Sequence, residues 1–139
     1  MTDDEVATFL REPVRPGLLA TVRADGRPHV APVWFDVDDD GTIVFNTGAE
    51  TVKGRNLART GEAALCVQDD RPPFAFVTVE GRVTIGEDLD EVRRWAARIG
   101  GRYMGADQAD AYGERNGVPG ELVVFLSPTK VLAKKDVAL

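Results

Sequence analysis

Alternation of apolar and polar positions dominates the chain and predicts β structure. Residues 18–47 read LLATVRADGRPHVAPVWFDVDDDGTIVFNT, three β-type runs that are separated by ADGRP and DDDG. Asp and Gly tolerate the backbone angles of tight turns, so these two breaks predict hairpins. Further strands are predicted in residues 62–70 and 74–88, the second with a bend at Gly81. Residues 121–135 return to β structure, either as two short strands or as one strand bent at its proline.

Helical periodicity replaces this alternation in three places. Apolar residues at helical spacing before Pro13 predict a short amphipathic helix over about residues 3–11, which we expect to cover one end of the β structure. A longer helix is predicted over residues 88–105, and a shorter polar one over residues 106–115. The apolar face of the longer helix is formed by Leu89, Val92, Trp95, Ala96 and Ile99.

This order of elements predicts a mainly β fold. About six antiparallel strands, interrupted by one short and one longer helix, are typical of a small closed or split β-barrel. Every break is the size of a turn, and there is no repeat, linker or low-complexity tract. We therefore expect residues 1–139 to form a single domain.

Composition narrows the function classes without choosing one. With 43% hydrophobic and 29% charged residues the chain resembles an ordinary globular protein, and its formal net charge of -6 argues against a general nucleic-acid binder. No apolar run approaches the ~20 residues of a membrane span. The opening MTDDEVATFLREPV lacks the cationic and apolar regions of a secretion signal, so we expect a cytoplasmic protein with no membrane partner.

The chain has one cysteine and one histidine, which argues against disulfide, zinc and triad chemistry. We therefore predict no metal site. Cys66 is interpreted as a small core residue, with a reactive thiol as the alternative. His29 lies in a predicted strand and faces away from Val30, where it either lines the barrel wall or an interface, or touches a ligand.

A basic segment follows the third β run and reads NTGAETVKGRNLARTG, residues 46–61. If Thr51 caps a helix, the free N–H groups of its first turn carry partial positive charge, and Lys53, Arg55 and Asn56 add hydrogen-bond donors. Such a helix start would hold a phosphate. The alternative is a solvated amphipathic helix that buries Leu57, and the residue pattern alone leaves both open.

Three other segments have a possible ligand role. Trp34 follows Pro32 and Val33 and either flanks a flat heterocycle or belongs to the core. Residues 102–105, RYMG, either line a pocket or simply end the long helix. The acidic stretch DVDDDGTIVFNT partly matches a calcium loop, but Thr47 occupies the position of the bidentate Glu, so we interpret it as a turn.

Taken together, GRPHVAPVWFDVDDDGTIVFNTGAETVKGRNLARTGEAALCV resembles the split-barrel flavin-binding superfamily typified by pyridoxamine 5'-phosphate oxidase. In that superfamily a Ser/Thr-x-Lys-x-x-Asn/Gln-Leu helix start holds the cofactor phosphate, and here the motif reads Thr51, Lys53, Asn56 and Leu57. The resemblance extends to VTVEGRVTI and to RYMG and so covers nearly the whole chain. It implies a six-stranded antiparallel split β-barrel with short flanking helices.

Within the superfamily, the small size, the PVWF strand and the RYMG helix end look most like the actinobacterial branch that uses the deazaflavin coenzyme F420. The resemblance implies a homodimer with two cofactor sites at its interface, the phosphate near Lys53 and the ring near Trp34. Residues 102–104 of the partner chain would complete each site. The cofactor-binding residues that follow from this are Pro32, Val33, Trp34, Asn46, Thr47, Thr51, Lys53, Arg55, Asn56, Arg102, Tyr103 and Met104.

The resemblance further implies an oxidoreductase that passes a hydride from reduced deazaflavin to an electron-poor acceptor such as a quinone, an enone or a tetrapyrrole. No residue is identified as catalytic. FMN in place of F420, and a non-catalytic flavin-binding protein, remain the alternatives. The arginine- and tryptophan-containing C-terminal segment of true pyridoxamine phosphate oxidases has no counterpart in VLAKKDVAL, so vitamin B6 oxidation is not expected.

Overall fold

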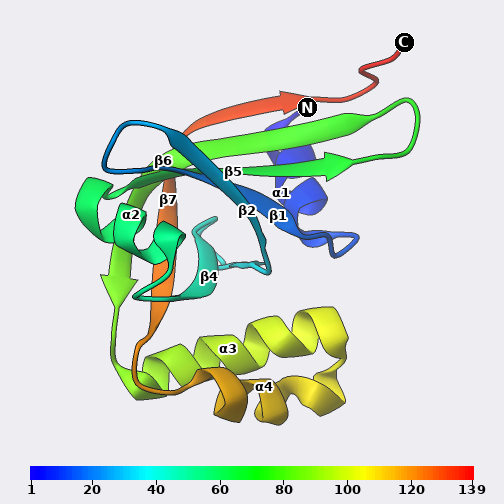
Figure 1. The fold of residues 1–139 in the computed structure, drawn as a ribbon. Coiled ribbons are helices and arrows are strands. Elements are labelled where there is room, and N and C mark those ends of the chain that lie inside the picture. The colour runs from blue at the N-terminus through cyan, green and yellow to red at the C-terminus, as the bar shows by residue number, and fades with distance from the viewer.

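The computed structural model describes residues 1–139 and shows one curled antiparallel sheet with helices packed around it (Figure 1). The strands form in the order β2-β1-β5-β6-β7-β4-β3. The elements are α1 (Asp3–Arg11), β1 (Gly17–Val22), β2 (Pro28–Val33), β3 (Asp36–Val37), β4 (Ile43–Gly48), α2 (Val52–Thr60), β5 (Glu62–Asp69), β6 (Ala75–Gly86), α3 (Leu89–Met104), a 3-10 turn (Ala106–Gln108), α4 (Ala109–Asn116) and β7 (Glu121–Lys134).

The sheet has seven strands rather than the predicted six, because one predicted run is divided into β2 and β3. These two consecutive strands lie at opposite edges of the curled sheet, and Trp34 and Phe35 form the crossing between them. The side chain of Phe35 is fully buried, and its N–H donates to the Tyr103 hydroxyl at 3.1 Å rather than to a strand. A hydrogen bond to a side chain thus replaces the strand ladder at Phe35, which the sequence pattern predicts as strand.

The predicted bends lie at one point of the sheet. β6 and β7 pair along most of their length, with a register shift between Glu80 and Gly81, and Gly81 lies opposite Pro128. A side chain on Gly81 would overlap the Ser127 carbonyl. The bend at Gly81 is confirmed, and β7 is one bent strand rather than two.

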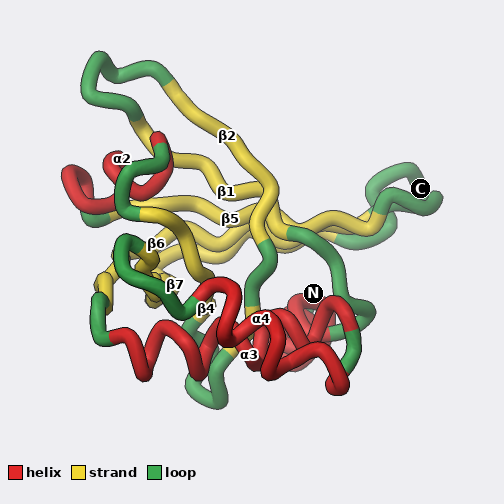
Figure 2. The backbone as a smooth tube through the Cα atoms, turned by 60° about the horizontal axis from the view of Figure 1, so that its bottom comes forward, coloured by secondary structure: helices red, strands yellow, loops and turns green.

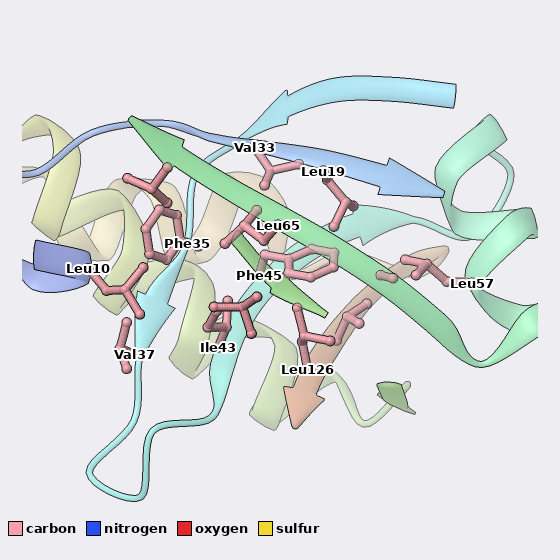
Figure 3. Packing of buried hydrophobic residues seen from close by; sticks show 14 of the residues in the cluster. Leu10, Leu19, Val33, Phe35, Val37, Ile43, Phe45, Leu57, Leu65 and Leu126 are labelled. Atoms are coloured by element: carbon pink, nitrogen blue, oxygen red, sulfur yellow. The ribbon is translucent and has the colours of Figure 1, made fainter. Parts of the chain in front are cut away.

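The main core fills the inside of the sheet (Figure 3). Its largest side chains, such as Phe35 and Phe45, are fully buried. A second, smaller cluster lies on the other side of β4, where α3 covers the sheet; it consists of Val44, Val92, Trp95 and Val123. Because β4 is covered on both sides, it is a rigid support for the residues at its end. Leu89, predicted on the apolar face of α3, is 40% exposed at the start of the helix.

The helices begin and end at local signals. Thr2 forms a capping box with Glu5 at the start of α1, whose bounds match the prediction, and Leu10 of α1 enters the main core. The predicted helix over residues 106–115 is the 3-10 turn followed by α4. Figure 2 shows α3 and α4 as a pair beside the sheet. No helix has the length and apolar character needed to cross a membrane.

Helix α2 starts at Thr51, as predicted. The Thr51 hydroxyl accepts from the Gly54 N–H at 3.0 Å and donates to the Gly48 carbonyl at 2.7 Å. Gly54 is buried against the end of β4, where a Cβ would overlap the Gly48 carbonyl oxygen. Only glycine lets the first turn of α2 approach this strand so closely.

We expect Gly54→Ala to destabilise the protein although alanine is the better helix former. The added methyl group has to displace backbone, which costs about 1–3 kcal/mol, against a helix-propensity gain of about 1 kcal/mol. Urea unfolding measures the net loss. Ala58→Gly, at an exposed position of the same helix, gives the propensity contribution alone. A Gly54→Ala protein as stable as the parent would contradict the close approach.

Candidate functional site

A cleft of about 310 Å³ lies where the end of β2, the strand β4 and the helices α2, α3 and α4 meet. Five residues predicted to bind a cofactor line it together: Pro32, Val33, Trp34, Asn46 and Lys53. Four lining residues were not predicted as site residues: Ala96, Ile99, Gly100 and Asn116. Two of these were assigned to the buried face of the long helix, and no feature of the sequence distinguishes a core position from a cleft wall. Asn116 ends α4 and carries no motif.

Lys53 is the charged residue of this cleft. It lies in the first turn of α2 and has no hydrogen bond or ion pair within the chain. Acidic side chains occupy the first turns of α1 and α3, as the helix dipole favours, whereas the first turn of α2 has none. A lysine beside the positive end of a helix is unfavourable unless an anion binds there. The arrangement therefore fits a phosphate or carboxylate ligand.

Three polar residues that were predicted to bind the cofactor form hydrogen bonds inside the protein. Asn56 is 3% exposed and donates to the Thr21 hydroxyl at 3.0 Å, so its amide does not reach the cleft. Thr47 is also buried, and its hydroxyl lies 3.1 Å from that of Thr51. The Thr51 hydroxyl is used in capping α2. The structure thus gives these side chains a role in holding α2 against the sheet.

Two further predicted donors differ in their availability. Arg55 is exposed and pairs with Glu50 at 2.7 Å, outside the residues that line the cleft. An exposed pair of this kind exchanges readily with solvent, so Arg55 can still turn toward an anion. The Asn46 amide donates to the Leu122 carbonyl at 3.2 Å, which fixes the side chain at the cleft wall.

An aromatic cluster forms the wall next to β2. Trp34 is 38% exposed and stacks on Tyr103, with ring centroids 5.0 Å apart and planes 5° from parallel. Tyr112 approaches Trp34 edge-on at 5.6 Å. Gly100 permits this approach, because a Cβ on it would overlap the Tyr112 side chain. The indole of Trp34 therefore packs from the β2–β3 connection onto the α3–α4 pair.

The RYMG segment is mostly structural within its own chain. The Arg102 guanidinium donates to the carbonyls of Leu10 and Arg11 at 3.1 and 3.2 Å, and its side chain is 13% exposed. The Tyr103 hydroxyl donates to the Arg15 carbonyl at 2.8 Å, and burial raises the pKa of this phenol above its usual value of 10. Of the three predicted residues, only Met104 is half exposed.

His29 and Cys66 lie outside the cleft. His29 is on the inner face of β2 opposite Thr21, and its Nδ1 is buried without a partner. Cys66 is not a core residue as predicted. It is partly exposed on the outer face of the sheet, opposite Leu18, because the inward positions of β5 are the alternate ones.

A larger hollow of about 680 Å³ lies on the outer face, between β1, β5 and β6. Its lining includes two carboxylates, Glu62 and Glu80, against a single cation, Arg82, which lies opposite Glu62 in the strand register, and it has no aromatic ring. These features are unfavourable for an anionic planar ligand. The smaller cleft at Lys53 therefore remains the candidate site.

The chain is similar to a known protein family over almost its whole length. The model of the pyridoxamine 5'-phosphate oxidase family matches residues 2–135. The chain belongs to the pyridoxamine 5'-phosphate oxidase family. It is 36% identical over 105 residues to an F420H2-dependent biliverdin reductase of Mycobacterium tuberculosis, covering 74% of this chain and 72% of that protein.

Other relatives in the family are oxidases. The chain is 31% identical over 136 residues to a pyridoxine/pyridoxamine 5'-phosphate oxidase of Pseudomonas paraeruginosa. The aligned region covers 96% of this chain and 54% of that oxidase. The chain thus spans about half the length of this oxidase.

Solved structures confirm the split-barrel fold of the family. A conserved hypothetical protein of Mycobacterium tuberculosis superimposes with a TM-score of 0.86 at 26% identity, covering 98% of this chain and 86% of that one. An F420 reductase superimposes with a TM-score of 0.70 at 28% identity, covering 90% of this chain and 94% of that one.

We expect Arg102→Met to lower the free energy of unfolding by about 2–3 kcal/mol. The change removes two charge-assisted hydrogen bonds to the end of α1 and one of the two cations that pair with Asp36, the guanidinium 3.8 Å away. Arg98→Met is the matched control, because Arg98 also pairs with Asp36 but is half exposed, and its loss should stay within about 1 kcal/mol. Urea unfolding of both variants tests this, and equal small losses would show that Arg102 is not a structural tie.

Proposed function

We propose that the protein is an F420-dependent reductase that binds the deazaflavin in the cleft at Lys53. The observation that carries this proposal is the unpaired Lys53 ammonium in the first turn of α2, on a cleft that the partly exposed Trp34 also lines. A cation and a flat apolar wall in one cleft suit a ligand that has a phosphate and an aromatic ring.

The residues present fit such a cofactor in two ways. The Lys53 ammonium and the N–H groups at the start of α2 would hold the phosphate, and Pro32, Val33 and Trp34 would bound the ring. When bound, reduced deazaflavin supplies a hydride to an electron-poor acceptor such as a quinone, an enone or a tetrapyrrole. The lining residues include no carboxylic acid, imidazole or thiol. This chain's part is therefore to bind, orient and exclude water, and we assign it no acid–base residue.

The choice of F420 over FMN rests on the relatives. The 36% identity to an F420H2-dependent biliverdin reductase and the likeness to an F420 reductase support the deazaflavin. Because the same family includes pyridoxine/pyridoxamine 5'-phosphate oxidases, FMN is the alternative cofactor. A non-catalytic flavin-binding role is the third possibility. We place the protein in the cytoplasm, where a reduced cofactor would be supplied.

We also propose that two copies pack together through the outer face of the sheet. The strand register groups exposed apolar side chains there, among them Leu18, Val22 and Val30, which are 40%, 48% and 59% exposed. Pro32 follows on the same face and also lines the cleft, so a partner on this face would border the cofactor site. A cleft of about 310 Å³ is at the small end of ligand sites, and a second wall would enlarge it.

The free edge of the sheet favours face-to-face packing over strand addition. β2 is an edge strand, and Pro28 and Pro32 have no N–H to offer a further strand. These prolines alternate with Val30. Of the three residues whose backbone faces the free edge of the sheet, only Val30 can therefore donate an N–H hydrogen bond to a further strand. An apolar face beside a blocked edge is suited to a partner that covers the face.

Lys53→Ala should weaken binding of the cofactor by about 1.5–3 kcal/mol, or roughly 10- to 150-fold, because a charge-assisted phosphate contact is lost. Parallel absorbance and fluorescence titrations of the purified protein with F420 and FMN measure this. Lys130→Ala, at an exposed lysine of β7 that lies 3.9 Å from Glu80, is the control and should bind like the parent.

The same titrations separate the alternatives. Tight FMN binding without measurable F420 affinity would replace the deazaflavin by FMN. Equal affinity of the Lys53→Ala protein and the parent would place the phosphate elsewhere. If reduced F420 binds but no quinone, enone or biliverdin speeds its oxidation, the protein stores or senses the cofactor rather than catalysing a reaction.

Val30→Lys should convert the dimer into a monomer, because a lysine at the centre of the apolar face would be buried without a partner charge. Sedimentation velocity at several concentrations measures the mass. Val118→Lys, at a position 41% exposed between α4 and β7, is the matched control and should leave the dimer intact. A parent protein that is monomeric, or a Val30→Lys protein that is still dimeric, would contradict packing through this face.

A further inference from the structure

Trp34 depends on side chains outside the barrel for its orientation. It is the first residue after β2, and its side chain is not part of the main core. The chain on both sides is fixed, because Val33 pairs with Gly17 and Phe35 is fully buried. The half-exposed indole, however, contacts the rings of Tyr103 and Tyr112 on the α3–α4 pair.

Tyr103 holds this point of the structure in two ways. Its ring lies parallel to the indole at 5.0 Å, and its hydroxyl joins the Phe35 N–H to the Arg15 carbonyl. The residue therefore fixes both the ring of Trp34 and the backbone immediately after it. Tyr103 is not among the residues that line the cleft.

We propose that Tyr103 is a positioning residue that fixes the ring plane of Trp34, so that the cleft accepts a planar tricyclic ring against the indole. This inference rests on the proposed function for its ligand, but not for its effect on Trp34. It differs from the role that the resemblance implies for Tyr103, which is contact with the cofactor bound by the partner chain.

Preorganisation is the physical reason to expect an effect on binding. An exposed indole with two free torsions occupies several rotamers. For a ligand that requires one of them, the apparent dissociation constant equals the intrinsic one divided by the fraction of molecules in that rotamer. Stacking on Tyr103 restricts these rotamers before the ligand arrives. Removing the stack should therefore weaken binding without removing any contact between protein and ligand.

The first test uses the free protein. In a Trp95→Phe background, Trp34 is the only tryptophan, so time-resolved fluorescence anisotropy reports its motion. We expect Tyr103→Leu to add a fast anisotropy decay and to weaken the near-ultraviolet circular dichroism of the indole, and Tyr103→Phe to keep the parent signals because the stack remains. Tyr103→Met is the second variant if the leucine variant does not fold. An indole as rigid in the leucine or methionine variant as in the parent would overturn the proposal.

The second test measures F420 and FMN affinity of the same Tyr103 variants with Trp95 restored. We expect Tyr103→Leu to lower the affinity for the cofactor by about two- to tenfold, which corresponds to the energy of one aromatic pair. The affinity of Tyr103→Phe should stay within about twofold of that of the parent. Phe125→Leu is the control, because it removes the aromatic partner of the other tryptophan, Trp95, at 6.1 Å. An equal loss in Phe125→Leu, or no loss in Tyr103→Leu, would overturn the proposal.

The two tests keep this inference separate from the proposed function. If neither cofactor binds the parent protein, the proposed function is wrong, while the anisotropy of Trp34 still decides whether Tyr103 positions it. If the parent binds and Tyr103→Leu binds equally well with a mobile indole, the function stands and the link between ring order and affinity is wrong.

Discussion

The crossing at Trp34 and Phe35 is the constraint on which the rest of the structure depends. It carries the chain from one edge of the sheet to the other, so the sheet has to curl until β2 and β3 are close enough for two residues to join them. The backbone there has no ladder partner, and a buried N–H without a partner is costly. The Tyr103 hydroxyl supplies the acceptor for Phe35, which couples closure of the barrel to the docking of α3.

The first turn of helix α2, in contrast, is held in place by contacts between residues close together in the chain. Thr51 caps the helix and Gly54 lets it lie against the end of β4, so its first turn is fixed by residues within a short segment. Asn56 and Arg59 then attach the helix to β1, through the Thr21 hydroxyl and the Val22 carbonyl. With its structural contacts met by these residues, Lys53 is left free on the cleft.

This difference between local and long-range contacts explains what the sequence could predict. Turns, caps and strand alternation depend on neighbours in the chain, and they were predicted with nearly correct bounds. Asn56 was assigned to the cofactor from the helix-start motif and Arg102 from the resemblance, as a residue of the partner chain. Within one chain their side chains bond to groups 35 and 91 residues away. A pattern cannot show such partners, and it cannot distinguish a buried helix face such as Ile99 from the wall of a cleft.

One part of the candidate site is held by local contacts and the other by long-range contacts, and this affects which cofactor it can select. The cation at Lys53 comes from a local motif and would attract the phosphate of any flavin-like cofactor. The wall at Trp34 depends on Tyr103 and Tyr112, which belong to the α3–α4 pair and lie 69 or more residues away in the chain. Affinity for phosphate and selection of the ring can therefore change independently, because substitutions in α3 and α4 alter the wall without disturbing the capped start of α2.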